Sequence, residues 1–173
     1  MDSGTLSPIA GSPFIPGRSP SPVAVDSVGK FLFVANSGSS DVSVFSITAG
    51  TGALSQVAGS PFPTGAGMEI SGIAVTPNGK TVYVSNFGSS SISALSVAAS
   101  GTLVPITGSP FPVDSDPRAL QVDPSGRFAY VPALTACEVE VYSIVSDGSL
   151  AVANRTAPAS RRLPSPLLPE PRQ

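Results

Sequence analysis

The chain has 173 residues, of which 41% are hydrophobic and 12% charged, and its formal net charge is −2. This length and composition suffice for one domain with a hydrophobic core, and they exclude a chain kept unfolded by its own charge. Residues 1–153 hold no basic cluster. Nucleic acid is therefore not expected as a partner, because phosphate contacts need concentrated Lys and Arg.

The N-terminus lacks the pattern of an export signal. An acid, Asp2, stands where a signal peptide has a basic region, and no apolar region follows it. The longest apolar run, Phe31–Ala35, is far shorter than the roughly 18 residues of a membrane span. We therefore expect a soluble, cytoplasmic chain without a membrane partner, although a longer parent protein could be exported. The one cysteine, Cys137, cannot form an intrachain disulfide and is interpreted as a small strand residue.

The chain is a tandem repeat. The tetrapeptide Gly-Ser-Pro-Phe occurs at residues 11–14, 59–62 and 108–111. Four glycines, each followed by a small residue and leucine, lie 48, 49 and 47 residues apart, at Gly4, Gly52, Gly101 and Gly148. Periods of this length are typical of propellers and solenoids, in which one structural unit is stacked on the next.

Each unit contains four short segments with strand character. In the first unit they are 23–25, 30–36, 41–47 and 53–57. The second unit repeats them at 73–75, 80–86, 91–97 and 102–106, and the third at 120–122, 127–133, 138–144 and 149–153. Aromatic and β-branched residues favour strands here, and no helical spacing of apolar residues interrupts them. We expect four antiparallel strands per unit.

The turn between the first and second strands has the same chemistry in all three units. A side-chain oxygen near its start can accept backbone N–H groups, and a glycine near its end can take a positive φ. The oxygens belong to Asp26, Thr76 and Asp123, and the glycines are Gly29, Gly79 and Gly126. These residues are interpreted as turn formers.

The third strand predicts how the units pack. In the first unit Val42 and Val44 point to one face, whereas Phe45 and Ile47 point to the other. Both faces of the sheet should therefore be covered by neighbouring sheets. The prediction is an all-β fold, a partial β-propeller of about three four-stranded antiparallel blades. The Gly-Ser-Pro-Phe copies are expected just after each outer strand, with the phenylalanine wedged between blades.

The second-strand segments at 32–36 and 82–86, with the Gly/Ser turns and third strands after them, resemble the YVTN-type propeller repeat. Together with Gly-Ser-Pro-Phe and the Val-Asp-x-x-Gly-Lys turn, they are similar to the lactonase family of seven-bladed propellers, which includes 6-phosphogluconolactonase-like proteins. The resemblance covers residues 4 to about 153 and implies a ring of seven blades. The third unit departs from it, because Ala133 stands where Asn36 and Asn86 stand and Pro132 enters the strand.

The expected domain organisation has two parts. Residues 1–153 form the partial propeller, with an outer strand at 4–10 and blades at about 11–57, 58–106 and 107–153. Residues 154–173 hold 5 of the 19 prolines and 4 of the 9 Lys and Arg, and match no further blade. We expect this segment to be a disordered tail, read out of frame or unrelated to the repeat.

The loops into the inner strands and the turns between second and third strands should share one face and form a binding face. The candidate binding residues on it are Arg18, Asn36, Asn86, Asp114 and Arg118, and the candidate catalytic residues are Glu69, Asp116 and Arg118. The alternatives are that the asparagines cap their own turns and that Glu138 and Glu140 are a solvated pair. A cation at Asp114 and Asp116 would need further oxygen ligands, so neither a metal nor a cofactor is expected.

The chain contains no histidine, which excludes a Ser-His-Asp triad and a histidine base. If the chain is an enzyme, the resemblance implies a lactonase-type ester hydrolase that opens a sugar lactone, with a carboxylate activating water and Arg118 holding the oxyanion. Activity is expected to be lost or to depend on assembly. The alternative is a non-catalytic scaffold. Exposed outer blade faces predict self-association, and two copies placed head to tail could close a six-bladed ring.

Overall fold

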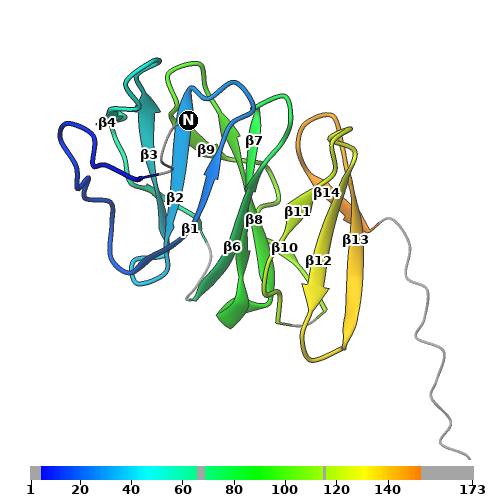
Figure 1. The fold of residues 1–173 in the computed structure, drawn as a ribbon. Helices are drawn as coiled ribbons and strands as arrows, with labels where there is room; N and C mark the ends of the chain where they lie inside the picture. The colour runs from blue at the N-terminus through cyan, green and yellow to red at the C-terminus, as the bar shows by residue number, and fades with distance from the viewer. Residues whose placement is uncertain (1–4, 66–68, 115, 153–173) are drawn as a thin grey trace, which may run out of the picture.

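The computed structural model describes residues 5–65, 69–114 and 116–152 (Figure 1). Blade one contains β1 (Pro20–Val25), β2 (Phe31–Asn36), β3 (Asp41–Ile47), β4 (Leu54–Gln56) and β5 (Phe62–Pro63). Blade two contains β6 (Ile70–Val75), β7 (Thr81–Asn86), the 3-10 helix η1 (Phe87–Ser89), β8 (Ser91–Val97), β9 (Leu103–Pro105) and β10 (Phe111–Pro112). Blade three contains β11 (Gln121–Val122), β12 (Phe128–Ala133), β13 (Glu138–Ile144) and β14 (Leu150–Val152).

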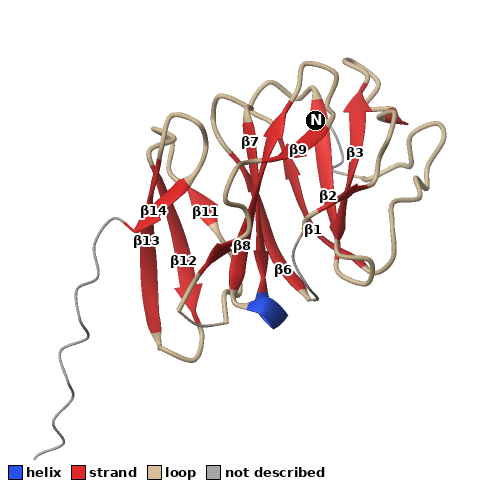
Figure 2. Cartoon of the chain, turned by 180° about the vertical axis from the view of Figure 1, so that it is seen from behind, coloured by secondary structure: helices blue, strands red, loops and turns tan. Residues whose placement is uncertain are grey.

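The three antiparallel sheets stand side by side, as Figures 1 and 2 show from opposite sides. Each sheet runs from an inner strand (β1, β6 or β11) to an outer one (β4, β9 or β14). The inner strands come together, because β6 lies against both β1 and β11. The predicted all-β fold, a partial propeller of about three blades, is confirmed.

The turns between the first and second strands form as predicted. In blade one, Asp26 Oδ1 accepts the N–H groups of Lys30 at 2.6 Å and Phe31 at 2.9 Å. Gly29 has a φ of 68°, which a residue with a Cβ adopts only at a cost. Thr76 and Asp123 take the same place in the other blades. These side chains replace the hydrogen bonds that the backbone loses where it reverses.

The hydrophobic core lies in the junctions between blades. One cluster joins Phe33, Val42 and Val44 of blade one to side chains of blade two, and a second cluster joins blades two and three. In β8, Leu95 belongs to the cluster shared with blade one and Ala94 to the cluster shared with blade three, so both faces of that strand are covered by neighbouring sheets as predicted. In β13 one face stays uncovered, as predicted for the outer face of blade three, because Val139 is 60% exposed and no further blade lies against it among the described residues.

In blades one and two the Gly-Ser-Pro-Phe segment follows the outer strand, as predicted, and its phenylalanine begins a second short strand at the outer edge of the same sheet. In blade one, β4 pairs with the end of β3, and β5, which begins at Phe62, pairs with the start of the same strand. Between them, Ser60 Oγ accepts the N–H of Val44 at 2.9 Å and takes the place of a ladder bond. The register is therefore kept across an outer strand in two pieces.

The predicted wedge is confirmed at two of the three copies. Phe62 belongs to the core cluster between blades one and two, and Phe111 packs on the cluster between blades two and three. Phe14 is half-buried and belongs to neither cluster. The outer strand predicted at 4–10 does not form over residues 5–10, because no third strand of a preceding blade lies beside it.

Blade three keeps its strand despite the departures from the repeat. Strand β12 pairs with β13 along its whole length, through Pro132 and Ala133. The turn that follows closes normally, with the N–H of Cys137 donating to the Leu134 carbonyl at 3.3 Å. The predicted tail, residues 154–173, lies outside the described residues. In the described part of the chain, no helix has the length and apolar character needed to cross a membrane.

Candidate functional site

The loops into the inner strands and the turns between second and third strands lie on one face, as predicted. Backbone hydrogen bonds join them in every blade. The Gly38 N–H donates to the Arg18 carbonyl at 3.0 Å, and the Phe87 N–H donates to the Glu69 carbonyl at 2.8 Å. In blade three, the Leu134 N–H donates to the Asp116 carbonyl at 3.3 Å. We call this side, marked by η1 in Figure 2, the turn face.

The two candidate asparagines lie beneath the turn face. Asn36 and Asn86 are fully buried, and each Nδ2 donates to the hydroxyl of a serine in the third strand at 2.9 Å. Asn36 Oδ1 also accepts the N–H of Gly17 at 3.1 Å. Asn86 Oδ1 is buried and has no such partner among the described residues. The capping alternative is wrong for Asn86, which makes no side-chain cap hydrogen bond to η1, and the burial of both asparagines argues against ligand contact.

Arg118 and Phe87 form a contact between blades on the turn face. The guanidinium carbon of Arg118 lies 4.1 Å from the centre of the Phe87 ring, so the cation is stacked on the aromatic face. The backbone N–H of Arg118 is held by the Pro132 carbonyl at 3.3 Å. The side chain is exposed. Stacking uses the flat face of a guanidinium and leaves its in-plane N–H groups directed outward, where they suit an oxyanion or a phosphate.

The candidate carboxylates come from the same loops of neighbouring blades. Glu69 is exposed and has a φ of 68°. Ser19 has a φ of 50° at the equivalent position of blade one, so the fold rather than a ligand imposes this conformation. Asp116 is half-exposed and accepts the hydroxyl of Thr135. Arg18, the remaining candidate, is exposed beside the blade-one turn.

Asp114 and Glu140 take part in a link between blades two and three. Glu140 Oε1 accepts the N–H of Asp114 at 3.1 Å, and Glu140 Oε2 accepts the hydroxyl of Tyr142. Glu140 is therefore engaged in internal hydrogen bonds and is not simply half of a solvated pair with Glu138. Across the described ranges, no three His, Cys, Asp or Glu side chains gather in a way that could hold a metal ion.

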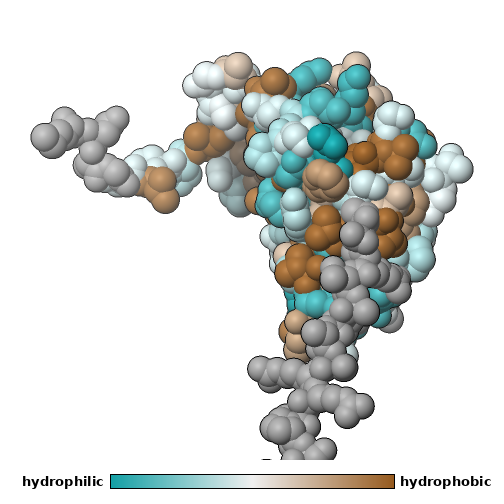
Figure 3. Space-filling view, turned by 90° about the vertical axis from the view of Figure 1, so that its right-hand side faces the viewer, coloured by the Kyte–Doolittle hydropathy of each residue, from teal (hydrophilic) through white to brown (hydrophobic). Residues whose placement is uncertain are grey.

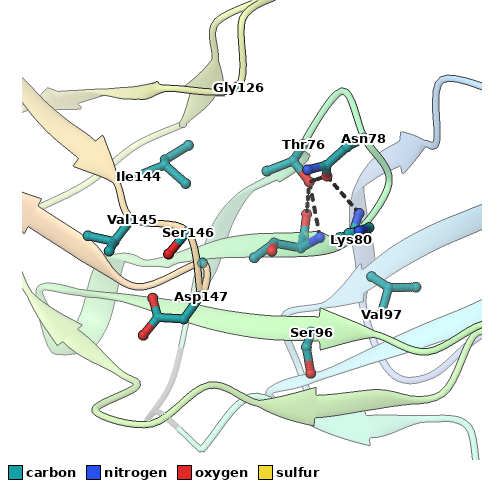
Figure 4. A pocket seen from close by; sticks show the side chains of 12 residues that line it. Thr76, Asn78, Lys80, Ser96, Val97, Gly126, Ile144, Val145, Ser146 and Asp147 are labelled. Carbon is teal, nitrogen blue, oxygen red and sulfur yellow. Dashed lines mark hydrogen bonds between the residues drawn. The ribbon is translucent and has the colours of Figure 1, made fainter.

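A second feature lies at the opposite end of the blades, in the junction between blades two and three. A cavity of about 450 Å³ opens there, and we call it the junction hollow (Figure 4). Lys80 reaches it from blade two and Asp147 from the β13–β14 turn of blade three. Hydrogen bonds from the hydroxyl and N–H of Ser149 hold the pKa of Asp147 below its ordinary value. The hollow is therefore rimmed by a cation and an anion.

Tyr83 spans this junction from the inside. Its hydroxyl donates to the Gly148 carbonyl at 2.8 Å, in the turn that borders the junction hollow. The side chain is fully buried. Burial raises the pKa of Tyr83 above its ordinary value, and the nearby Asp147 carboxylate adds to this effect. The phenol therefore stays protonated and serves as a fixed donor between the blades.

A family model described as lactonase, 7-bladed beta-propeller, matches residues 60–162, which is more than half of the chain. The chain belongs to this lactonase family. The match continues past residue 153, where the repeat was expected to end. No curated protein matches the sequence.

Solved structures agree with the family at the level of the fold. A candidate 6-phosphogluconolactonase from Bacteroides uniformis is 25% identical, with a TM-score of 0.70 over 80% of this chain and 40% of that chain. A periplasmic gluconolactonase from Pseudomonas aeruginosa is 23% identical, with a TM-score of 0.67 over 80% of this chain and 39% of that chain. A Lactobacillus plantarum protein is 23% identical, with a TM-score of 0.68 over 78% of this chain and 40% of that chain. This lactonase-family chain thus spans about 40% of the length of these relatives.

Sequence reasoning missed two features of this lactonase-family chain. Phe87 was not singled out, although an aromatic residue in an exposed turn, one position after Asn86, was a signal that the sequence offered. The junction hollow was also missed. Its signal was Thr81, which stands where the other two units have Phe31 and Phe128.

Proposed function

We propose that the turn face of this lactonase-family chain binds an anionic sugar lactone, or the acid formed from it, and contributes to hydrolytic opening of the lactone ring. The observation that carries the proposal is Arg118 stacked on Phe87 across the junction of blades two and three. An exposed arginine on an aromatic ring presents fixed donors to a phosphate or carboxylate group. The family match supplies the substrate class.

The chemistry asked of the residues is that of ester hydrolysis. Water adds to the lactone carbonyl carbon, its proton passes to a carboxylate, and the ring C–O bond breaks with a proton returned to the departing oxygen. We assign the role of the base to Glu69 or Asp116, two carboxylates of the turn face. Arg118 would stabilise the charge that develops on the carbonyl oxygen. Because the chain spans about 40% of its relatives, we expect the complete site to need blades beyond these three.

The second candidate function is a non-catalytic binding scaffold. It is favoured because several polar side chains at the turn face form hydrogen bonds within the chain itself. Asn36, Asn86 and Asp116 all accept or donate hydrogen bonds within the chain. The sequence also holds no histidine that could serve as a base at neutral pH. On this alternative, Arg118 binds an anion and no bond is broken.

Binding and turnover separate the two candidates. Titration of the 173-residue protein with 6-phosphogluconate, followed by calorimetry or NMR, tests binding, and release of acid from 6-phosphoglucono-δ-lactone tests turnover. Arg118→Ala should weaken binding by roughly tenfold or more, because a charge-assisted hydrogen bond is lost. The matched control is Arg127→Ala, since Arg127 also stacks on an aromatic ring, that of Phe128 at 5.4 Å, but lies at the other end of the blade.

Each outcome decides a specific point. Equal binding by the Arg118 and Arg127 variants would show that Arg118 does not bind the ligand. Binding without any turnover favours the scaffold. Turnover that is lost in Glu69→Gln or Asp116→Asn, with binding retained, assigns the base.

A further inference from the structure

The outer side of blade three exposes an apolar surface. It is formed by side chains of β12 and β13 that face away from blade two, and we call it the trailing flank: Phe128, Tyr130, Pro132, Val139 and Val141. Tyr130 is 39% exposed and Val139 is 60% exposed. Figure 3 looks toward this side of the molecule, and several hydrophobic side chains reach the surface in that view.

Blade one exposes a matching surface on its own outer side. This leading flank is formed by Val23, Val25, Leu32, Val34 and Phe45, which share one side of the sheet by their pairing. Val23 is 59% exposed and Val25 is 49% exposed, whereas Val34 and Phe45 are buried. The exposed part therefore lies along the inner strand.

The two internal junctions show what covers each flank. The positions of Tyr130 and Val139 are occupied in blade one by Phe33 and Val42, which are fully buried by blade two. The position of Val23 is occupied in blade two by Ile73, which blade one covers to 8% exposure. The trailing and leading flanks are thus the two halves of a junction that the chain builds twice within itself.

The N-terminal segment already lies on the leading flank as an outer strand of a preceding blade would. The N–H of Gly17 donates to Asn36 Oδ1 and to Ser43 Oγ, both at 3.1 Å. Ile9 lies 3.7 Å from the position of a Cβ on Gly52. Val57 lies against Gly101 in the same way at the next junction.

This segment carries the Gly-Ser-Pro-Phe copy that lacks a sheet. In the other two copies the serine hydroxyl accepts a third-strand N–H at 2.9 Å, from Val44 to Ser60 and from Ala94 to Ser109. Blade three has the opposite deficit, since its described sheet is four-stranded and has no counterpart of β5 or β10. Among the described residues, one Ser-Pro-Phe segment thus has no sheet to join and one sheet lacks such a segment.

We propose that the trailing flank of one copy of this chain binds the leading flank of a second copy. Phe14 of the second copy takes the place that Phe62 takes between blades one and two, beside Val139 of the first copy. Ser12 of the second copy accepts the N–H of Val141. The contact is heterologous, so it joins copies head to tail and either closes a ring or continues as a chain of copies.

One segment has to move for this contact. In this contact, residues 5–10 of the second copy would occupy the same place as β14 of the first copy, because both segments are equivalent to β4 in the repeat. Residues 5–10 are exposed and form no strand, whereas β14 is paired with β13 through three residues. Residues 5–10 are therefore displaced, and the residues around Phe14 make the contact. This proposal is independent of the proposed function.

The test uses the 173-residue protein and charge substitutions on each flank. Light scattering after gel filtration should give a mass of two chains or a higher multiple for the wild type, with concentration dependence. Val139→Glu removes the trailing flank and Val23→Glu the leading flank, and each variant alone should be monomeric. Val28→Glu is the matched control, since Val28 is 81% exposed in a turn outside both flanks. This control should assemble like the wild type.

A mixing experiment distinguishes a head-to-tail contact from other association. Val139→Glu keeps an intact leading flank and Val23→Glu an intact trailing flank, so an equimolar mixture should form a one-to-one dimer and stop there. Circular dichroism confirms that each variant is folded. A monomeric wild type at every concentration overturns the proposal, as does a mixture of folded variants that stays monomeric. Equal assembly of all three variants also overturns it.

Discussion

The two blade junctions share a backbone arrangement but differ in how they are filled. Between blades one and two, the buried ring of Phe31 fills the space beside the β8–β9 turn, where Gly101 lies. Between blades two and three, Thr81 stands at the position of Phe31 and lines the junction hollow of about 450 Å³. The ring present at the first junction is thus absent from the second, although Ile106 and Thr81 still lie close to Gly148 there.

The lysine that precedes this position behaves differently in consequence. Lys30 lies 4.7 Å from the centre of the Phe31 ring, and its Nζ donates to the Ala99 carbonyl at 2.8 Å. Lys80, its counterpart, lines the hollow instead. The second junction has a different stabilising contact, the hydrogen bond from Tyr83 to Gly148, where Phe33 has no hydroxyl to offer. An apolar contact at one junction corresponds to a polar one at the other.

The largest expected effect comes from emptying the packed junction. Phe31→Ala should lower the free energy of unfolding by about 3 to 4 kcal/mol, because it removes a buried ring and leaves a cavity. Thr81→Ala, the change at the equivalent position of the next blade, should cost only about 1 kcal/mol, because far less buried volume is removed. Urea unfolding followed by circular dichroism measures both. Similar losses for the two variants would mean that the junctions do not differ in packing.

A glycine pair isolates the close approach at the packed junction. A Cβ on Gly101 would lie 2.6 Å from the Phe31 ring and 3.0 Å from Val57, and its φ is 88°. Gly50 has a similar φ of 83° with nothing within 4 Å. Both alanine variants carry a backbone cost of about 1 kcal/mol, and Gly101→Ala should lose about 1 to 2 kcal/mol more from overpacking.

The double variant shows whether that extra loss comes from the ring. In a Phe31→Ala background, Gly101→Ala should cost little more than Gly50→Ala does, because the nearest atom, on the Phe31 ring, is gone and only the Val57 methyl group at 3.0 Å remains. Urea midpoints of the four proteins give the coupling. An undiminished penalty for Gly101→Ala in that background would attribute it to other contacts.

The polar contact of the open junction should be worth less. Tyr83→Phe should lower the free energy of unfolding at neutral pH by about 1 to 2 kcal/mol, because the Gly148 carbonyl loses its buried donor. Tyr130→Phe, at the equivalent but exposed position, should stay within about 0.5 kcal/mol. Equal effects of the two changes would show that the hydrogen bond contributes nothing specific.

The same tyrosine predicts a loss of stability in alkali. Its pKa is raised in the folded protein above the usual 10.0, so the stability that it contributes is present below about pH 10 and falls as the pH rises beyond that value. Unfolding of wild type and Tyr83→Phe at about pH 9 and pH 11 measures the effect. The wild type should lose more stability between these pH values than the variant does.

The blades were predictable because strands of the same length recur at the same spacing in every unit. The alternation in β3 and in its counterpart β8 further predicts that sheets stack on both faces of a blade, which the central blade confirms. The second short outer strand that begins at the phenylalanine of the Gly-Ser-Pro-Phe segment was not predictable in the same way. It depends on Ser60 replacing a ladder bond to Val44, and a hydroxyl in a loop gives no sign of which N–H it will meet.

The candidate site was predictable only as far as the chain direction determines it. Antiparallel order places the loops of Arg18, Glu69 and Asp116 on one face. The stacking of Arg118 on Phe87 joins residues of two blades, and their distance follows from blade spacing rather than from any local pattern. The junction hollow likewise depends on volume missing at Thr81, which becomes visible only when the next blade is in place.

The smallest expected effect concerns the turn beside the hollow. Blade two begins this turn with the neutral Thr76, whereas blade three uses Asp123, which accepts the N–H groups of Arg127 at 2.8 Å and Phe128 at 2.9 Å. The Ser125 hydroxyl, followed by these backbone groups, lowers the pKa of Asp123 from the usual 3.8 to about 2. The stability that it contributes is therefore present above about pH 4 and is lost as the pH falls through about 2.

Exchanging the two turn residues tests this origin of acid sensitivity. Asp123→Thr should reduce the difference in unfolding free energy between about pH 5 and pH 2, and Thr76→Asp should increase it, because the carboxylate moves with the substitution. Urea midpoints at constant ionic strength give both differences. The change should be small, since Asp123 is solvent-exposed and water screens its interactions. An unchanged difference in both variants would place the acid sensitivity of the fold in carboxylates other than the turn residue.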